Sequence, residues 1–495
     1  MYLVNTDMDM SMALQRINPS LYLLGSLSLL GQPSQAADVK LTPYAATEFT
    51  FTDNVDRTAS NPQSSFITEL EAGIEGTIEG NRGLISLDYA LGYLYYTEGE
   101  QSDELYQDLD FIAYKGLGRS GFQVDASASI DNIASDIATD ANADVISGDT
   151  IQSNEAEVGL SYQTNPLSTM DLRSRIYTNV INNEDDIGNY TGWGGNIVYA
   201  NGRSVRDTFW RLGAFYDYRK GRDDGIATEF TRLNEIIGLQ TISGFSPFLR
   251  LNYENYDGVT DSSENEIFNW GGGVRYFIDR YSYGEVSYNF SEDDVNSDFW
   301  AGAINLNPTD KTRLYFEYDK RIKGDSYAAE IRNRTRRWTN TLTYTESPDS
   351  YERDRFVDGG RIDEIYLRKE ARWLSELTLR RTLYSFSLYQ IDRETLESLS
   401  DLTDDNSRGI ELDVNHQLSR VLSGHIGYAY ERYDFTYLST GDESDDYHTF
   451  SLDTTYFFRP ELFTQTGVEY YTRSSSDSVN DYDETRIFID VRVEF

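Results

Sequence analysis

Residues 486–495 read RIFIDVRVEF, and the spacing of their side chains is the strongest structural signal in the chain. Apolar side chains stand at every second position: Ile487, Ile489, Val491, Val493 and Phe495. Most positions between them are charged: Arg486, Asp490, Arg492 and Glu494. Successive side chains of a β-strand point to opposite faces, so a period of two predicts a strand with one apolar face and one charged face.

A strand of this kind that ends on an aromatic residue resembles the assembly signal of outer-membrane β-barrels. We assign this barrel-assembly signal to four residues: Ile489, Val491, Val493 and Phe495. The two faces fit a strand that lies between lipid and a water-filled interior. A soluble β-propeller would also contain alternating strands, but the sequence has no repeat of blade length.

The rest of the chain continues this pattern. Alternation recurs, for example, over residues 85–93, 122–131 and 410–418. The chain has 38 Tyr and 9 Pro; Tyr favours strands and membrane interfaces, whereas Pro is poorly tolerated inside a sheet. The mean hydropathy of −0.56 is polar, as expected when only one face of each strand is apolar. These features predict an all-β fold, a single large antiparallel transmembrane β-barrel.

The N-terminus has the features of an export signal. Arg16 supplies a short basic region, residues 21–30 an apolar core, and residues 34–36 a small-residue cleavage site. We therefore expect a signal peptide over residues 1–36, with Met12 as an alternative start, and the barrel over residues 37–495. A buried N-terminal helix is the competing interpretation. Because the chain has no Cys, we expect neither a lipid-anchored cysteine nor a disulfide.

Short and long connections alternate between the predicted strands. The expected count is about 24 strands (22–26), at roughly 19 residues for each strand and its loop. Short turns are predicted to face the periplasm, at residues 80–83, 117–120 and 459–460 among others. Longer acidic loops are predicted to face outward, for example at residues 132–151 and 435–446. The longest loop, residues 347–366, is the candidate for folding into the barrel.

Charge is distributed unevenly along the chain. There are 83 acidic and 43 basic residues, a formal net charge of −40, and most acidic loop residues are interpreted as a solvated surface. A specific Ca²⁺ site would need a turn glycine and a bidentate Glu at fixed positions, and the Asp spacing in the loop at 132–151 does not include them. Between Lys311 and Arg381 the balance reverses, with 17 basic against 13 acidic residues.

The centre of this basic region is a predicted arginine ladder on one strand face. Its members are Arg332, Arg334 and Arg336. If this face lines the lumen, the ladder would hold carboxylates or phosphates. Pairing with neighbouring acidic residues, or anchoring at lipid headgroups, is an equally good interpretation.

The sequence gives no sign of catalysis. Its three histidines, His416, His425 and His448, do not accompany an evident Ser or Asp constellation. Cys is absent and the histidines are scattered, so no metal-ligand cluster is predicted. We expect no catalytic residue, no metal, no cofactor and no nucleic-acid partner.

Three passages resemble the outer-membrane β-barrels associated with the PEP-CTERM/exosortase system, a β-barrel porin type. They are residues 49–55 (FTFTDNV), residues 325–347 with their RTRRW motif at 334–338, and residues 365–369 (IYLRK). The motifs cover about a tenth of the chain. A His often precedes the RTRR motif in that family, whereas Asn333 stands here.

This resemblance implies a porin that exports exopolysaccharide across the outer membrane, beside a periplasmic polysaccharide-export partner. Further expected partners are outer-membrane lipid and lipopolysaccharide and the barrel-assembly machinery. The residues alone leave other functions open. These are a general or cation-selective diffusion porin, a non-conducting surface scaffold or adhesin, and a sheath around an electron carrier.

Overall fold

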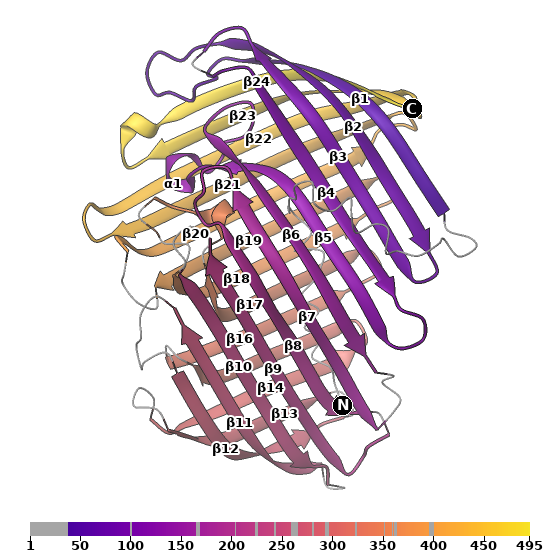
Figure 1. Cartoon of the computed structure of the whole chain (residues 1–495), viewed down its shortest axis with the longest axis vertical. Coiled ribbons are helices and arrows are strands. Elements are labelled where there is room, and N and C mark those ends of the chain that lie inside the picture. The colour runs from indigo at the N-terminus through magenta and orange to yellow at the C-terminus, as the bar shows by residue number, and fades with distance from the viewer. Residues whose placement is uncertain are drawn as a thin grey trace.

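The computed structural model is a closed ring of antiparallel strands (Figure 1). The structure describes residues 38–495 apart from 100, 165–168, 203, 223–225, 242–243, 259–265, 280–281, 293–296, 322–323, 351, 359, 361–363 and 396–399. The predicted signal peptide, residues 1–36, lies outside the described residues. No helix among the described residues is long and apolar enough to cross a membrane.

Twenty-four strands form the ring in the described part of the chain. The first twelve are β1 (Asp38–Thr52), β2 (Ser65–Gly80), β3 (Gly83–Tyr96), β4 (Glu104–Gly116), β5 (Phe122–Ala134), β6 (Thr150–Gln163), β7 (Met170–Asn183), β8 (Tyr190–Asn201), β9 (Thr208–Gly221), β10 (Ala227–Leu239), β11 (Phe245–Asp257) and β12 (Glu266–Phe277). The others are β13 (Tyr283–Ser291), β14 (Phe299–Thr309), β15 (Thr312–Arg321), β16 (Gly324–Arg334), β17 (Trp338–Ser350), β18 (Ile365–Thr378), β19 (Thr382–Thr395), β20 (Leu402–Gln417), β21 (Leu422–Tyr437), β22 (Gly441–Arg459), β23 (Leu462–Ser475) and β24 (Tyr482–Glu494). The connections hold a short helix, α1 (Ile137–Asp140), and two 3₁₀ turns, η4 (Arg353–Arg355) and η5 (Ser478–Asn480).

Each strand pairs with its neighbours in the sequence, and β24 pairs with β1 to close the ring. The closing register places Thr47 opposite Val491 and Tyr44 opposite Glu494. The backbone N–H of Phe495 donates to the carbonyl of Pro43 at 2.8 Å. Because every strand then has two partners, no edge is left open, and the predicted barrel of about 24 strands is confirmed.

The outer face of the ring is apolar. Large side chains are exposed there, for example Ile176, Leu249 and Trp300, each more than 60% exposed. A soluble protein rarely exposes so much apolar surface, whereas a membrane barrel presents it to lipid. Outward aromatic side chains also stack in pairs, as Trp193 does with Tyr216, with ring centroids 4.9 Å apart.

The two ends of the barrel differ. One end, the short-turn end, carries the connections that follow even-numbered strands, such as residues 81–82 and 335–337, as well as the C-terminus. The other end, the long-loop end, carries the connections after odd-numbered strands, including residues 53–64 and 135–149. In Figure 1, the C-terminus lies at the right of the barrel and α1 lies toward the left.

One predicted loop is wrong. Residues 435–446 were expected to form an acidic loop, but β21 runs to Tyr437 and β22 begins at Gly441. Two acidic residues of this segment are paired on the strands: Asp445 with Arg473 at 2.9 Å and Asp446 with Arg432 at 3.1 Å. Charge density alone therefore indicated a loop where cross-strand pairing supports a hairpin.

Candidate functional site: the lumen and its constriction

The lumen contains three connections that fold inward from the long-loop end. We call residues 53–64, 135–149 and 352–358 the constriction segments. Segment 135–149 bonds to Tyr96, Tyr447 and Arg473, strand residues on the face opposite the exposed apolar side chains. Segment 53–64 reaches the same face through Arg57, and segment 352–358 through Val357. That face is therefore the lumen face, and loops folded onto it narrow the interior of a wide barrel.

The segment 135–149 carries α1, which starts at an N-cap. The Asp136 side chain accepts from the Ala138 N–H at 2.8 Å and so satisfies one of the free donors of the helix. Alternation stops after Ala134, where the short helix turns the chain away from the wall. The sequence placed this segment in an exposed acidic loop; the structure instead buries Ile137 and Asp140.

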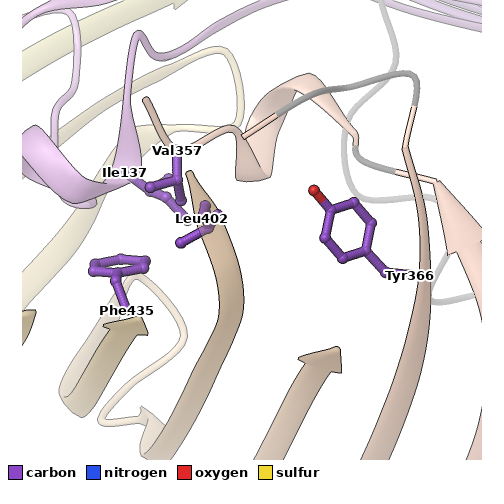
Figure 2. Packing of buried hydrophobic residues seen from close by; sticks show 5 residues of the cluster. All are labelled: Ile137, Val357, Tyr366, Leu402 and Phe435. Carbon is purple, nitrogen blue, oxygen red and sulfur yellow. The ribbon is translucent and has the colours of Figure 1, made fainter. Parts of the chain in front are cut away.

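An apolar cluster joins two constriction segments to the wall. Figure 2 shows Ile137 of α1 and Val357 of segment 352–358 beside Leu402 of β20 and Phe435 of β21, with Tyr366 of β18 in the same cluster. Val357 and Leu402 are fully buried. Burial of this apolar area stabilises the inward fold of both segments. The prediction that loop 347–366 folds inward agrees with this position, although its strands extend to Ser350 and from Ile365.

A second apolar cluster fixes the first constriction segment. Its buried members are Val55, Ile67, Leu94, Tyr96 and Tyr106, and Val145 and Ile146 pack against them. The Tyr96 hydroxyl also donates to the Val145 carbonyl at 2.8 Å. Segment 135–149 is thus held at both of its ends, by different walls of the barrel.

Between the clusters lies a network of five ionised side chains, which we call the ionic lock: Arg57, Asp140, Asp144, Glu484 and Arg486. Arg57 reaches Asp140 at 2.7 Å, Asp144 at 3.3 Å and Glu484 at 2.9 Å. Arg486 reaches Asp144 at 2.8 Å and Glu484 at 2.7 Å. The side chains of both arginines are 3% exposed and that of Glu484 is 0% exposed. Charges this deeply buried persist because they are paired.

The ionic lock shifts the pKa values of Asp144 and Arg57, which lie in the constriction segments. Burial alone would raise the pKa of Asp144, but the guanidiniums of Arg486 and Arg57 more than offset it and hold that pKa below its ordinary value. Burial alone would lower the pKa of Arg57, but the carboxylates of Asp144, Asp140 and Glu484 raise it well above its ordinary value. Both groups are therefore ionised at neutral pH, as the lock requires.

One wall of the lumen is acidic. Inward-facing carboxylates gather on β1–β4 and β24 below the lock: Glu48, Glu69, Glu71, Glu75, Asp88, Asp108 and Asp490. Arg492 lies among them; it pairs with Glu75 and lies 3.7 Å above the Tyr44 ring. This wall repels anions and attracts cations.

The opposite wall is rich in arginine and tyrosine. Arginine guanidiniums lie over tyrosine rings in a series of stacks along β7–β19: Arg175 on Tyr177, Arg219 on Tyr190, Arg275 on Tyr283, Arg313 on Tyr315 and Arg372 on Tyr389. The ring-to-guanidinium distances run from 4.3 to 5.7 Å. We call this surface the Arg–Tyr wall. It presents aromatic faces and N–H donors side by side.

Contacts across the lumen pinch the ring at β9–β17. Arg250 of β11 pairs with Asp319 of β15, and Arg321 of β15 reaches Glu254 of β11 at 2.9 Å. Arg219 of β9 donates to the Ser350 hydroxyl of β17. These strands are not neighbours in the ring. The wall must therefore fold back between β11 and β15, around β13, and enclose a narrow lobe of the lumen.

The structure divides the predicted arginine ladder. Arg332 and Arg334 lie two positions apart on β16, on the face opposite the exposed Ile331, and so face the lumen. β16 ends at Arg334, so Arg336 lies in the turn at 335–337 and does not share the strand face as expected. The turn forms because the Thr335 side chain and backbone bond to Trp338 and close the hairpin early.

The predicted assembly residues lie on the outer face of β24. Ile489 is 45% exposed and Phe495 is 76% exposed, consistent with contact to lipid. Val491 and Val493 share this face by alternation. Their role in assembly stays a prediction.

Sequence reasoning did not find the lock or the environment of His425. His425 lies between two lumen carboxylates, at 2.8 Å from Asp453 and 3.2 Å from Asp413. Within the described residues, however, no group of three or more His, Cys, Asp or Glu could hold a metal ion. A possible signal for the lock was the close spacing of Asp140 and Asp144, but their partners are 83 and 342 residues away.

The model of a family described as "Putative beta-barrel porin 2" matches residues 397–495, which include β20–β24. These strands resemble a porin family. The match and the closed ring support a porin-like protein of an outer membrane. No curated protein matches the chain.

Several solved structures share the barrel architecture at low identity. A loop-deletion form of OmpT, an outer membrane protein of Vibrio cholerae, is 11% identical with a TM-score of 0.33, covering 93% of this chain and 100% of that one. An FrpB iron transporter from Neisseria meningitidis is 8% identical with a TM-score of 0.49, covering 91% and 81%. A BenF-like porin from Pseudomonas fluorescens Pf-5 is 11% identical with a TM-score of 0.35, covering 92% and 99%. Likenesses this low do not bear on function.

Proposed function

We propose that this protein is an outer-membrane porin through which an exopolysaccharide leaves the cell. The observation that carries the proposal is the Arg–Tyr wall. The apolar faces of sugar rings pack on tyrosine rings, while guanidinium N–H groups donate to sugar hydroxyls and carboxylates. Stacks on successive parts of the wall give a long sugar chain many equivalent contacts, which suits sliding better than tight binding.

The proposal includes the route and the partners of the protein. The signal peptide over residues 1–36 directs the chain across the inner membrane. The barrel-assembly machinery engages the outer face of β24 through Ile489, Val491, Val493 and Phe495. Its short-turn end then faces the periplasm and receives polymer from a periplasmic export partner, while the acidic long-loop end lies among lipopolysaccharide. PEP-CTERM/exosortase association would place this export beside that system.

A cation-selective diffusion porin is the second candidate, and the acidic wall favours it. Carboxylates along β1–β4 and β24 would concentrate cations in a water-filled lumen. A non-conducting scaffold or adhesin is the third candidate, favoured by the constriction segments inside the barrel. Single-channel recording separates the two, because the porin conducts with a preference for cations and the scaffold does not conduct.

Deletion of the gene tests the export function. We expect polymer to disappear from the surface and medium and to accumulate in the periplasm, with release restored by the wild-type gene. Arg332→Gln/Arg334→Gln should restore release poorly, because both side chains face the lumen near the short-turn end. Arg336→Gln/Arg337→Gln, in the adjacent turn, is the matched control and should restore release fully. Unchanged polymer release after deletion would exclude export and favour the diffusion porin.

A further inference from the structure

Arg211 on β9 is a lumen-facing cation without a counterion. It lies two positions from Phe209, which packs under the Arg275 guanidinium on the lumen face, so Arg211 shares that face. No carboxylate or hydrogen-bond acceptor among the described residues pairs with its side chain. Four other lumen arginines are paired: Arg175 with Glu157, Arg250 with Asp319, Arg275 with Glu285 and Arg313 with Glu330.

The register explains why Arg211 has no partner. Its cross-strand neighbours are Ala200 on β8 and Ile236 on β10, and neither carries a charge. On its own strand, Phe209 and Gly213 flank it on the lumen face. Arg211 is half-buried. Every side-chain nitrogen of Arg211 that lacks a hydrogen bond is open to solvent. The guanidinium therefore stays accessible from the lumen while its surroundings offer it no internal anion.

Aromatic rings lie next to this cation in the narrow lobe. Phe209, Phe248, Phe277 and Tyr283, which we call the aromatic belt, surround the Arg275 guanidinium at 4.3 to 5.9 Å from their centroids. Phe209 and Phe277 meet edge to face, with centroids 6.1 Å apart, although β10 and β11 separate their strands. Three of the four lie within two positions of a strand end at the short-turn end, and Phe248 is the fourth residue of β11.

The ionisable groups that act on the Arg211 charge do not neutralise it. They are Tyr283, Tyr315, Glu317 and Arg173. Glu317 accepts a hydrogen bond from the Tyr315 hydroxyl, and Arg173 pairs with Asp171 at 3.2 Å. Glu317 therefore stays charged but forms no ion pair with Arg211, and the second cation adds to the positive potential. A cation in this setting favours an anion supplied from outside.

We propose that Arg211 and the aromatic belt form an entry site for a carboxylated sugar at the short-turn end of the lumen. The guanidinium fork matches a carboxylate in a bidentate arrangement, and the sugar ring packs on Phe277 and Tyr283, the two belt rings that are partly exposed. Phe209 and Phe248 are buried and support them. A small inorganic anion would use the cation but leave the rings uncovered, and a neutral sugar would leave the cation unpaired. The inference rests on the proposed export function and deepens it, because it assigns acidic residues to the polymer.

The test uses the purified full chain and three probes: trigalacturonate, neutral maltotriose and inorganic phosphate. Calorimetry measures binding, and single-channel recording measures block by each probe added from either side. We expect trigalacturonate to bind and to block from the short-turn side. Arg211→Gln should weaken it about tenfold or more, and Arg211→Lys, which keeps the charge but loses the fork, should weaken it less. Arg337→Gln, in the turn at 335–337 and outside the belt, is the matched control and should change little.

Four results would overturn the inference: equal binding of maltotriose, equal binding of phosphate, an unchanged affinity in Arg211→Gln, or a loss in Arg337→Gln instead. A heat-induced gel shift confirms that each variant is folded, and Arg211→Lys stands in if Arg211→Gln does not assemble. The entry site and the export function can be refuted independently of each other. Arg211-dependent binding with unchanged polymer release in the deletion strain would retain the site and refute export, whereas blocked release without binding would do the reverse.

Discussion

The guanidinium of Arg57, in the connection after β1, lies 2.9 Å from the carboxylate of Glu484 on β24, and both side chains are buried. The two residues stand near opposite ends of the described chain, yet β1 and β24 are neighbours in the closed ring. Their contact therefore exists only after the ring has closed. It also ties a constriction segment to the closing strand, so barrel closure and the narrowing of the lumen are coupled.

Arg57→Met should release the constriction. The change leaves Asp140, Asp144 and Glu484 with one arginine, and loss of one partner from a buried ionic network costs about 3–5 kcal/mol. We expect a lower unfolding temperature in a gel-shift assay and larger, noisier single-channel conductance. Arg432→Met is the control, because its pairs with Asp434 and Asp446 are about 30% exposed and should contribute less than about 1 kcal/mol. Equal effects of the two changes would show that the buried ionic lock contributes no more stability than an exposed ion pair.

Asp144 should make the folded barrel less stable in acid. Its pKa is held below the ordinary value by Arg486 and Arg57 despite burial, so its contribution is present above the ordinary pKa of about 3.9 and is lost as pH falls through the lowered value. The unfolding temperature of wild type should exceed that of Asp144→Asn from pH 7 to about pH 5, and the gap should close in stronger acid. Asp434→Asn should show little gap at any pH, and a gap that widened in acid would contradict the assignment.

Val357→Asp should free the segment 352–358 from the wall. A carboxylate has no partner in the apolar cluster of Figure 2, where Val357 is fully buried. Trypsin should then cleave after Arg353 or Arg355, sites that the packed segment protects, and mass spectrometry would locate the cuts. Val479→Asp, at a side chain that is 74% exposed, is the matched control and should leave the digestion pattern unchanged.

Phe495→Ala should reduce the amount of assembled barrel. The side chain faces outward at the end of β24, where its backbone N–H also bonds to Pro43 of β1. We expect less heat-modifiable protein in the outer membrane and more unfolded chain in the periplasm. Phe458→Ala removes an outward aromatic that is 59% exposed near the same end and should assemble normally. Normal assembly of both variants would remove Phe495 from the signal.

The period of two was sufficient to predict the fold class and nearly all of the barrel architecture. Alternation reports which face a side chain takes, and it persists because every strand separates an apolar exterior from a polar interior. The same reasoning failed at residues 435–446, where opposite charges pair across strands, and at Arg336, where the hairpin turns. Strand ends depend on cross-strand partners, which a local pattern does not contain.

By itself, then, the sequence determined the strands, their two faces and the candidate basic region, because these depend on residues one or two positions apart. Only the tertiary structure decided that Arg57 meets Glu484, that acidic segment 135–149 lies inside the barrel, and that Arg211 has no counterion. Those properties arise from ring closure and strand register. Both bring together residues that can be hundreds of positions apart. An ionised side chain is stabilised or left unpaired according to the residue that the register places beside it.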